Sequence, residues 1–398
     1  MKKKRIAVLT SGGVDSSVVV DLLYKEGHEL HLFYIRIGMD NGEGDCSAEE
    51  DLDLCRLIAK KYSLPLTEVS LHEEYWEHVM AYTLQTVERG LTPHPDMMCN
   101  KLIKFGFFEQ RWGHEFDAVA TGHYASTVEE EGYKFLATAV DPVKDQTDFL
   151  AQINYSQLQH LIFPLGNLPK ERVREMAKEA ILPTATRKDS QGICFLGKIN
   201  YNDFIERHLG TRPGPIIDIA TGKKIGEHRG YWFHTIGQRK GLGLSGGPWY
   251  VVKKNIRDNV IYVSNGYDTS LQYGRNIPIE EMNWITLDPF AGGVPERFAA
   301  KDGELRVTFK NRHTPLFLTA TMKRVADGSY LIESDEDVQG IAPGQFAIIY
   351  TPDRRLCLGS GMISIPEQKK KRHRRQTKKH NQDHDKEKTS ASTDRDNI

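Results

Sequence analysis

Residues 11–17 read Ser-Gly-Gly-Val-Asp-Ser-Ser and join the apolar run Ile-Ala-Val-Leu at 6–9 to a second apolar run that starts at Val18. The first run fits a buried strand and the second a helix, so the seven residues form the turn between them. Two adjacent glycines let the backbone bend where a Cβ would clash, and successive N–H groups can then point at one anion. The helix that follows offers its partial positive end to the same anion. The stretch therefore predicts a phosphate-binding loop.

The polar side chains of this loop suit a polyphosphate. Ser11, Ser16 and Ser17 can donate hydroxyl hydrogen bonds, and Asp15 is placed to hold a magnesium ion between phosphates. No Lys follows the glycines, so the loop is not of the Walker type. An ordinary glycine-rich turn is the alternative, but it explains only the two glycines. The string resembles the signature of the N-type ATP pyrophosphatases, which split ATP between its α and β phosphates and adenylate an oxygen atom.

Composition limits the class of protein. The chain has 398 residues, 39% of them hydrophobic, which predicts two or three domains. Residues 366–398 carry 11 Lys/Arg and 6 Asp/Glu, whereas residues 1–365 carry 42 and 48. A mildly acidic body needs a local basic surface to bind nucleic acid. The basic tail should be disordered, and it either grips phosphates nonspecifically or only solvates the chain.

The cysteines indicate a reducing compartment. Five cysteines, with no C-x-x-C pair, argue against a disulfide framework and against a zinc ribbon. No stretch approaches the roughly 20 apolar residues of a membrane span. The start, Met-Lys-Lys-Lys-Arg, lacks the apolar segment of a secretion signal. We therefore expect a cytoplasmic protein without a membrane partner.

The periodicity of the first 140 residues predicts an α/β fold, a doubly wound and mostly parallel sheet. Strands fit 5–10, 30–37, 66–71 and 117–121, and helices fit 16–26, 48–62, 73–89 and 101–112. A further helix opens at Pro169. Ligands bind at the carboxyl ends of such strands, which is where Ser11 and Gly122 fall.

The pattern changes after Gly197. Residues 200–275 mix one helix, 201–208, with glycine-rich turns and short strands, which predicts a small mixed domain. Beyond it, runs at 305–310, 316–322, 330–333 and 346–350 predict an antiparallel β-barrel, with a hairpin turn at Asp327-Gly328. The expected division is a nucleotide-binding catalytic domain at 1–199, a central domain at 200–275, the barrel at 276–365 and the tail at 366–398.

Two cysteines stand out by their surroundings. Cys99 follows Pro93 and Pro95, and a helix that begins near Lys101 would favour its thiolate. Asp96 opposes this if ionised, so a protonated or proton-shuttling Asp96 resolves the conflict. Cys194 lies between glycines in a loop. A buried inert thiol is the alternative interpretation for both, and the stronger one for Cys46, Cys55 and Cys357.

A series of motifs gives a closer match. The sequence is similar to the ordered blocks of the tRNA-specific 2-thiouridylases, the MnmA/TrmU family, across residues 5–365. These blocks are 11–17, Pro95-Asp96 with Cys99-Asn100, 103–105, 121–124, Lys144-Asp145-Gln146, 192–195, 235–243 and Pro343-Gly344-Gln345. Two departures are His94, where Asn is common, and Asp148, where an aromatic residue is usual.

The resemblance implies ATP-dependent transfer of sulfur to C2 of the wobble uridine of tRNA. ATP adenylates O2, and Cys194 carries the sulfur as a persulfide that a sulfur-carrier protein or a cysteine desulfurase supplies. Cys99 then frees the sulfur or forms a Cys99–Cys194 disulfide, with Asp96 as acid and base. Mg²⁺ accompanies ATP, and the tRNA anticodon loop supplies an unstacked base.

The resemblance also assigns binding residues. ATP would lie against Leu9, Thr10, Ser11, Gly12, Gly13, Val14, Asp15, Ser16, Ile35 and Gly122. The tRNA would contact His94, Pro95, Asp96, His123, Lys144, Asp145, Gln146, Asn311, Arg312 and Gln345.

Three other interpretations stay open on sequence alone. An amidating or ligating synthetase of the same superfamily would need neither cysteine. A noncatalytic RNA-binding protein would need neither Asp15 nor the thiols. An iron–sulfur cluster would use Cys99, Cys194 and one further ligand.

Overall fold

The computed structural model describes residues 2–37, 46–188, 201–266, 268, 271, 274–325 and 328–365, with Cys46 and Ser47 described as backbone only. Cys194, Asp327 of the expected hairpin turn and the basic tail lie outside these residues. Residues 1–363 form one unit and residues 364–398 another. The features below belong to the first unit. The division at residues 199, 275 and 365 stays a prediction.

Five parallel strands form the N-terminal sheet, in the order β3-β2-β1-β4-β7. They are β1 (Arg5–Thr10), β2 (Glu29–Arg36), β3 (Leu66–Ser70), β4 (Ala118–Ala120) and β7 (Leu161–Ile162). In register, Ile6 pairs with Leu30 on one side and with Ala118 on the other. The chain reverses strand order beside β1, where the glycine loop follows.

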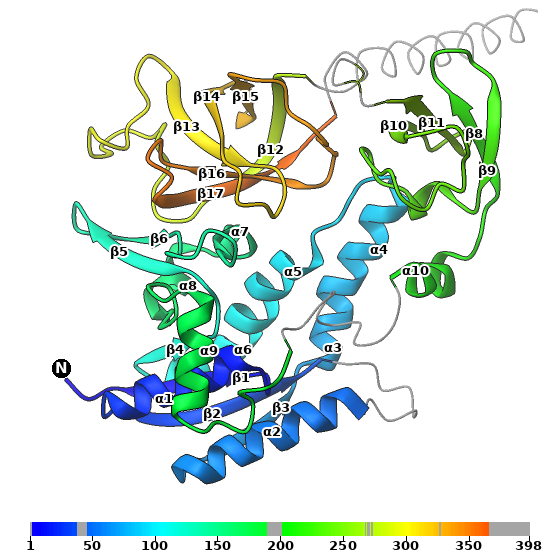
Figure 1. Cartoon of the computed structure of the whole chain (residues 1–398). Helices are drawn as coiled ribbons and strands as arrows, with labels where there is room; N and C mark the ends of the chain where they lie inside the picture. Colours follow the sequence, from blue (N-terminus) through cyan, green and yellow to red (C-terminus); the bar gives the residue numbers. More distant parts are fainter. Residues whose placement is uncertain are drawn as a thin grey trace, which may run out of the picture. The chain divides into compact units, whose positions relative to one another are not determined.

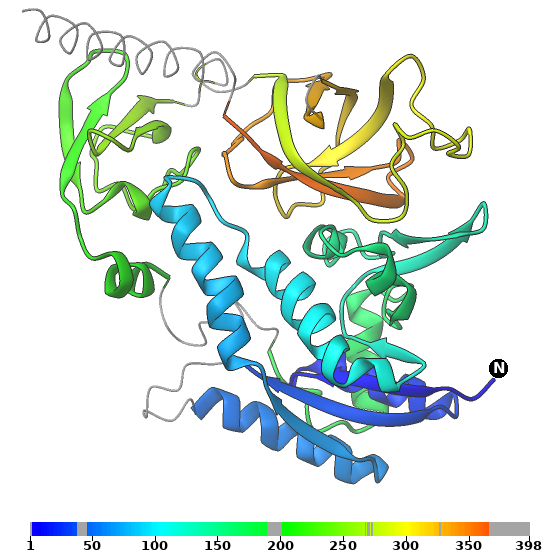
Figure 2. The same ribbon diagram turned by 180° about the vertical axis from the view of Figure 1, so that it is seen from behind.

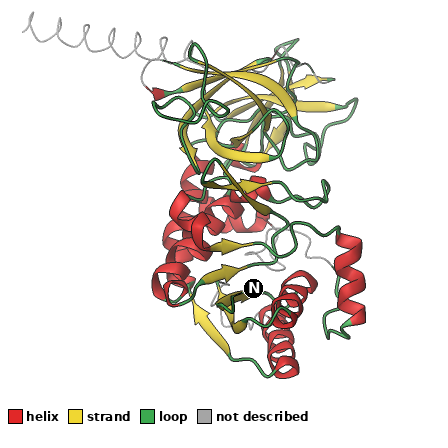
Figure 3. Cartoon of the chain, turned by 90° about the vertical axis from the view of Figure 1, so that its left-hand side faces the viewer, coloured by secondary structure: helices red, strands yellow, loops and turns green. Residues whose placement is uncertain are grey.

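Helices cover both faces of this sheet because its side chains alternate between two cores. Ile6 and Val8 face α1 (Val14–Lys25), α2 (Cys46–Tyr62) and α9 (Lys170–Glu179). Ala7 and Phe33 face the opposite side and pack against two long helices. Figure 3 shows helices on both sides of the strands of this sheet. The predicted doubly wound fold is confirmed.

The two long helices each contain a wider, π-type section. The first runs over 72–88 as α3 (His72–Glu74), η1 (Tyr75–Met80) and α4 (Ala81–Glu88). The second runs over 95–111 as α5 (Pro95–Met98), η2 (Cys99–Phe107) and α6 (Phe108–Arg111). The predicted start near Lys101 was wrong, because Pro95 occupies the first helical position, where its fixed φ fits and no N–H is needed.

Short helices and one small sheet complete the part before the barrel. The helices are η3 (Gly113–Glu115), α7 (Thr147–Leu150), α8 (Tyr155–His160), α10 (Tyr201–Leu209) and η4 (Tyr231–Phe233). The strands are β8 (Gly214–Asp218), β9 (Lys224–His228), β10 (Trp249–Asn255) and β11 (Val260–Asn265), in the order β10-β11-β8-β9. Because β11 and β8 are parallel and the other pairs antiparallel, the sheet is mixed.

Six antiparallel strands close into the predicted barrel. They are β12 (Asn276–Trp284), β13 (Glu304–Lys310), β14 (Leu318–Arg324), β15 (Tyr330–Ser334), β16 (Phe346–Tyr350) and β17 (Leu356–Ile363). Strand β12 pairs with both β15 and β17, which closes the barrel. The sequence analysis did not identify β12 or β17. Glycines in β17 weaken its strand pattern, yet Gly359 is needed because a Cβ there would lie 2.0 Å from the Asn283 carbonyl oxygen.

A hairpin from the N-terminal region extends the barrel sheet. Strands β5 (Ser126–Glu130) and β6 (Tyr133–Ala137) form the hairpin, and β6 pairs with β17 through Leu136 and Cys357. Figures 1 and 2 show this hairpin beside the barrel from two sides. Within the described residues, no helix has both the length and the apolar character needed to cross a membrane.

Candidate functional site

The glycine loop is held by its own side chains. Gly13 precedes α1, and its carbonyl oxygen accepts hydrogen bonds from Ser16 Oγ at 3.2 Å and Ser17 Oγ at 2.8 Å. Ser16 Oγ also accepts from the Ser11 backbone N–H at 3.3 Å. Ser16 and Ser17 are buried, whereas Ser11 is exposed. The two buried hydroxyls therefore shape the loop, and Ser11 remains at its surface for a ligand.

A second contact ties the loop to α2. Gly12 has a φ of +66°, and a Cβ there would lie 2.5 Å from the Asp51 carbonyl oxygen. Arg187 donates to the Gly12 carbonyl oxygen at 2.8 Å and forms an ion pair with the Asp51 carboxylate. Only glycine fits this backbone conformation and this close approach. The sequence analysis did not identify Arg187, which fixes the loop from 175 residues away.

The other predicted nucleotide residues gather at the carboxyl edge of the sheet. Leu9 and Thr10 end β1, Ile35 lies near the end of β2, and Gly122 follows β4. Thr10 Oγ1 donates to the Phe33 carbonyl oxygen at 3.1 Å. A Cβ at Gly122 would lie 3.0 Å from the Ser16 backbone nitrogen, so Gly122 packs directly on the start of α1. The structure thus brings this predicted set together.

Asp15 has a lysine as its partner. Lys170 Nζ lies 2.7 Å and 2.8 Å from the two carboxylate oxygens of Asp15, and Tyr124 donates its hydroxyl to Oδ1 at 2.9 Å. The same Lys170 nitrogen lies 5.6 Å from the Tyr124 ring centroid. Lys170 begins α9, and its backbone N–H donates to Asp141 at 3.0 Å. The sequence analysis did not identify this lysine.

Lys170 therefore neutralises the carboxylate of Asp15, with a bond to each of its oxygens. The magnesium contact of Asp15 stays a prediction. Among the described residues, no cluster of three or more His, Cys, Asp or Glu side chains has a metal-binding arrangement. A loop of backbone N–H groups with a lysine beside it fits an anionic polyphosphate.

His123 links the edge of the sheet to the helix that carries Cys99. Its Nδ1 shares a hydrogen bond with Thr121 Oγ1 at 2.8 Å, and its ring meets that of Phe105 edge to face at 6.1 Å. Burial lowers the pKa of His123 well below its usual value, so the imidazole is neutral near pH 7. A neutral ring here can donate or accept one hydrogen bond but offers no charge.

A chain of hydrogen bonds runs from Asp15 to the residue beside Cys99. Tyr124, which binds Asp15, donates its backbone N–H to Gln146 Oε1 at 3.0 Å. Gln146 accepts at its carbonyl oxygen from the Phe149 N–H at 3.1 Å. The Phe149 carbonyl oxygen in turn accepts from Asn100 Nδ2 at 3.1 Å. The anion loop and the cysteine helix are therefore parts of one bonded assembly.

Cys99 lies in the second turn of its helix, in the core that includes Met97 and Ile103. The predicted effect of a helix N-terminus on its thiolate was wrong, because that terminus is at Pro95. Cys99 is 1% exposed, whereas Asp96 is partly exposed. A reaction at this sulfur requires its surroundings to open. Cys194 and the expected disulfide lie outside the described residues.

His94 caps this helix. Its Nδ1 accepts a hydrogen bond from the Met97 backbone N–H at 3.4 Å. Burial lowers the pKa of His94, which keeps Nδ1 available as an acceptor. The Phe149 ring lies between two histidine rings, 5.6 Å from His94 and 4.6 Å from His313. The departure at position 94 therefore preserves a cap, since Asn accepts in the same way.

The departure at position 148 also has a structural reason. Asp148 is buried and lies 2.8 Å from His313 Nδ1, so an ion pair replaces the usual aromatic side chain. The hydrogen bond to Asp148 raises the pKa of His313. The pair joins α7 to the loop after β13, beside the aromatic ring that contacts His94.

The predicted tRNA residues fall into two groups. Asp145 is buried in an ion pair with Lys310, so it supports the fold, and its tRNA contact stays a prediction. Lys144 and Gln146 on either side of it are only partly buried. Residues of the barrel loops form a second group: Asn311 Nδ2 bonds the Gln339 carbonyl oxygen at 3.1 Å, and Arg312 Nη2 bonds that of Gly340 at 3.0 Å.

The loop that contains Gln345 touches the linker that leads to Cys99. The Thr92 N–H donates to the Pro343 carbonyl oxygen at 2.8 Å, and a Cβ at Gly344 would lie 2.9 Å from the Thr92 nitrogen. Gln345 bonds Ile363 through its backbone. A barrel loop is therefore in direct contact with the linker that precedes the cysteine helix.

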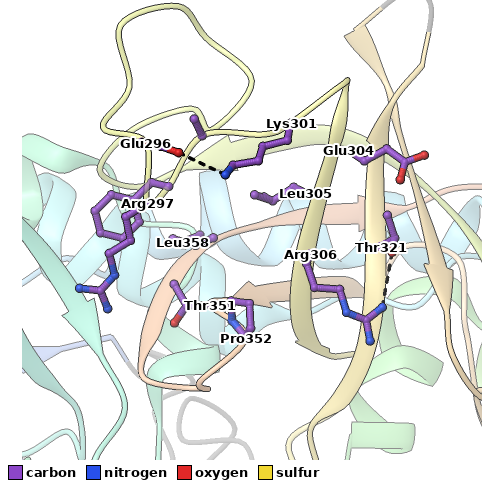
Figure 4. A pocket seen from close by; sticks show the side chains of 12 residues that line it. Glu296, Arg297, Lys301, Glu304, Leu305, Arg306, Thr321, Thr351, Pro352 and Leu358 are labelled. Carbon is purple, nitrogen blue, oxygen red and sulfur yellow. Dashed lines mark hydrogen bonds and ion pairs between the residues drawn. The ribbon is translucent and has the colours of Figure 1, made fainter.

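A cavity away from these residues lies in the barrel. It measures about 650 Å³ and is lined by barrel residues, among them Arg297, Lys301, Glu304 and Arg306. Figure 4 shows Lys301 bonded to Glu296 and Arg306 bonded to Thr321. Each cation already has an acidic partner: Arg297 pairs with Glu130, and Arg306 with Asp335. No predicted site residue lines this cavity, so we assign it no part in the chemistry.

Models of three known domain families match consecutive parts of this chain. The model of the tRNA methyl transferase HUP domain matches residues 4–198, that of the tRNA methyl transferase PRC-barrel domain residues 202–265, and that of the aminomethyltransferase beta-barrel domain residues 275–363. Among solved structures, the U34-tRNA thiolase NcsA from Methanococcus maripaludis is 17% identical, with a TM-score of 0.34, over 52% of this chain and 65% of that one. A TM-score this low does not indicate a shared function.

Two relatives are far closer. The tRNA-specific 2-thiouridylase MnmA of Parabacteroides distasonis is 59% identical over 360 residues, covering 90% of this chain and 98% of that protein. The protein of the same name from Porphyromonas gingivalis is 60% identical over 361 residues, covering 90% and 99%. Because this identity extends over nearly the full length of the relatives, the chain belongs to the family of tRNA-specific 2-thiouridylases.

Proposed function

We propose that this chain replaces the C2 oxygen of the wobble uridine of tRNA with sulfur and consumes ATP, giving 2-thiouridine, AMP and pyrophosphate. The observation that carries the proposal is the bonded path from Asp15 through Tyr124 and Gln146 to the helix of Asp96 and Cys99. A synthetase that transfers ammonia would not need a thiol on that path. The names of the close relatives support the same activity.

The first step is adenylation. The N–H groups of the loop at 11–16 bind phosphates, and Ser11 presents its exposed hydroxyl. Lys170, oriented by Asp15 and Tyr124, supplies the positive charge that a Walker loop takes from its own lysine. The uridine O2 attacks the α phosphorus and pyrophosphate leaves. Mg²⁺ would accompany the phosphates of ATP, and Asp15, which also orients Lys170, would contribute a ligand to it.

The second step is sulfur transfer. The terminal sulfur of a Cys194 persulfide forms a bond to C2, and the C2–O bond to AMP breaks. Asp96 takes the proton released by the attacking persulfide. The Cys99 thiolate then attacks Cys194 Sγ, which leaves sulfur on C2 and a Cys99–Cys194 disulfide. An external dithiol reduces that disulfide.

The partners follow from this chemistry. A sulfur-carrier protein or a cysteine desulfurase must load Cys194. The anticodon loop would contact residues that are partly exposed, while Asn311 and Arg312 fix two barrel loops. The partly exposed residues are His94, His123, Lys144, Gln146 and Gln345. A cytoplasmic location stays a prediction.

The test is incubation with ATP, unmodified tRNA and a labelled persulfide donor. Label should enter the RNA with the wild-type chain. Cys194→Ser and Cys99→Ser should each abolish transfer and leave ATP–pyrophosphate exchange largely intact. Cys357→Ser, which removes a buried barrel thiol, is the matched control and should transfer sulfur normally. Full transfer by Cys194→Ser would refute the persulfide role.

A further inference from the structure

Two adjoining cavities lie beside the linker that leads to the Cys99 helix. The first measures about 320 Å³ and lies between residues 91–95, the start of α10 at Tyr201, and the loop at 232–238. The second measures about 360 Å³ and shares Phe233, His234 and Gln238 with the first. Volumes of this size accommodate a small planar ligand. Of the residues predicted from sequence to bind ATP or tRNA, only Pro95 lines either cavity.

The walls of the first cavity are aromatic. Tyr201, Trp232 and Phe233 line it, and all three are only partly buried, so ring surface remains accessible. The Arg229 guanidinium lies over the Phe233 ring, 5.0 Å from the centroid. An aromatic ring backed by a guanidinium is a favourable stacking partner for a nucleobase.

A neutral polar group lies at the junction of the two cavities. His234 is 8% exposed, lines both cavities, and has no hydrogen-bond partner for Nδ1 among the residues that the structure describes. Burial lowers the pKa of His234 to about 4, so the ring is neutral near pH 7. Lys254 Nζ donates to the His234 carbonyl oxygen at 2.9 Å and fixes the backbone. A neutral imidazole suits the polar edge of a base and not a phosphate.

Positive charge lies where a backbone would pass. Lys240 lines the second cavity, and both Lys240 and the adjacent Arg239 are exposed. The acidic residue in the same wall, Glu227, is paired with Lys224 at 2.6 Å. Aromatic walls, one neutral polar group and cations at the edge are the combination that recognises single-stranded RNA.

We propose that the paired cavities bind the nucleobase adjacent to the wobble uridine, stacked on Phe233 and bonded at its edge by His234. This inference rests on the proposed function. The linker residues that wall the first cavity lead directly into Asp96 and Cys99, so a ligand there is next to the reacting base. Extruding one base breaks its stacking with its neighbour, which then needs a new partner. The cavities supply that partner and make the neighbour a determinant of substrate choice.

The test uses anticodon stem-loop RNAs with an unmodified wobble uridine and, next to it, either the natural nucleotide or an abasic one. With the wild-type chain, the abasic RNA should raise KM about tenfold, the cost of losing one stacked base, with little change in kcat. Phe233→Ala should raise KM for the natural RNA by a similar factor and should no longer distinguish the two RNAs. Equal abasic penalties in both proteins would overturn the proposal.

The matched control is Tyr262→Ala. Tyr262 is also a partly exposed ring of the central region with a cation at 5.0 Å, here Lys253, but it lines neither cavity. It should leave the KM for both RNAs unchanged. ATP–pyrophosphate exchange should be normal in every variant. A wild-type chain that thiolates neither RNA would instead contradict the proposed function.

If Phe233→Ala fails to fold, a second variant and a fluorescence measurement still test the stacking on Phe233. Phe233→Leu keeps an apolar side chain and removes the ring. RNA with 2-aminopurine next to the wobble position should be quenched when it binds the wild-type chain and not when it binds Phe233→Leu. Equal quenching in both proteins, or none in either, would contradict stacking at Phe233 and would fit a cavity filled by a free nucleotide or by protein.

Discussion

Lys310 Nζ lies 3.2 Å from Asp145 Oδ2, and the two side chains are 1% and 3% exposed. The pair joins strand β13 of the barrel to the segment before α7, next to the path between the anion loop and Cys99. Thr147 Oγ1 donates to the same Asp145 oxygen, and the Lys310 ammonium lies 4.2 Å from the Phe317 ring centroid. The pair therefore holds the segment that leads to Gln146 against the barrel.

Removing one partner of the Lys310–Asp145 ion pair should destabilise the protein. Lys310→Met leaves a buried carboxylate without its cation and should lower the free energy of unfolding by about 3–5 kcal/mol. Lys310→Met combined with Asp145→Leu should cost less than the sum of the single changes, as denaturant unfolding would measure. Lys301→Met, which removes an exposed pair with Glu296, is the control and should cost at most about 0.5 kcal/mol. Additive single and double costs would contradict the coupling.

Lys170→Met should impair adenylation. It removes the cation beside the phosphate loop, so ATP–pyrophosphate exchange should fall about a hundredfold. Lys178→Met, an exposed lysine at the other end of α9, should exchange normally. Unchanged exchange in Lys170→Met would remove this residue from the proposed function.

Gly12→Ala should weaken ATP binding, because its Cβ would collide with the Asp51 backbone and push the loop away from α2. Gly27→Ala is the matched control. Gly27 also has a positive φ, +81°, but nothing lies within 4 Å of its Cβ position. Both changes should cost about 1 kcal/mol of backbone strain, and only Gly12→Ala should raise the Kd for ATP. Equal Kd values would show that the close approach does not shape the loop.

The His313–Asp148 pair should make stability depend on pH. Because the bond to Asp148 raises the pKa of His313, folding favours the protonated ring. This stabilisation is complete below the unfolded pKa of about 6.5 and disappears as pH rises through the higher folded value. Wild type and His313→Gln should therefore differ most in unfolding free energy near pH 6 and converge at alkaline pH. A difference that grows with pH would contradict the pairing.

Replacing His94 should separate its capping role from its packing against Phe149. His94→Ala removes the acceptor for the Met97 N–H and should cost about 1 kcal/mol, whereas His94→Asn keeps an acceptor and should cost a few tenths. Thermal unfolding of the two variants measures the difference. Equal destabilisation would mean that packing against Phe149, and not the cap, is what His94 contributes.

Local sequence signals were sufficient to predict the fold class and the phosphate-binding loop. The turn at 11–17 and the strands around it depend on residues within a short stretch, so pattern and propensity identify them. The helix start at Pro95 was missed because proline suits both an extended approach and a first helical turn. Strand β17 was missed because its glycines serve contacts with a strand far away in the chain.

The site was only partly predictable for a related reason. Lys170 and Arg187 reach the loop from 155 and 175 residues away, and neither belongs to a local motif. A topological argument could have found Lys170, since a helix that begins after β7 starts at the same sheet edge as the loop. The burial of Asp145 could not be predicted either, because it depends on a barrel lysine that sequence alone does not place beside it.

The pairing of β6 with β17 bears on how the protein is made. Residues 136–137 find their partners at 356–357, almost the last part of the described chain to leave the ribosome. The nucleotide-binding region can therefore form its own sheet during translation, but the hairpin beside it has an open edge until synthesis nears completion. A product truncated before residue 356 would keep the ATP loop and expose that edge, which makes incomplete chains prone to aggregation rather than partially active.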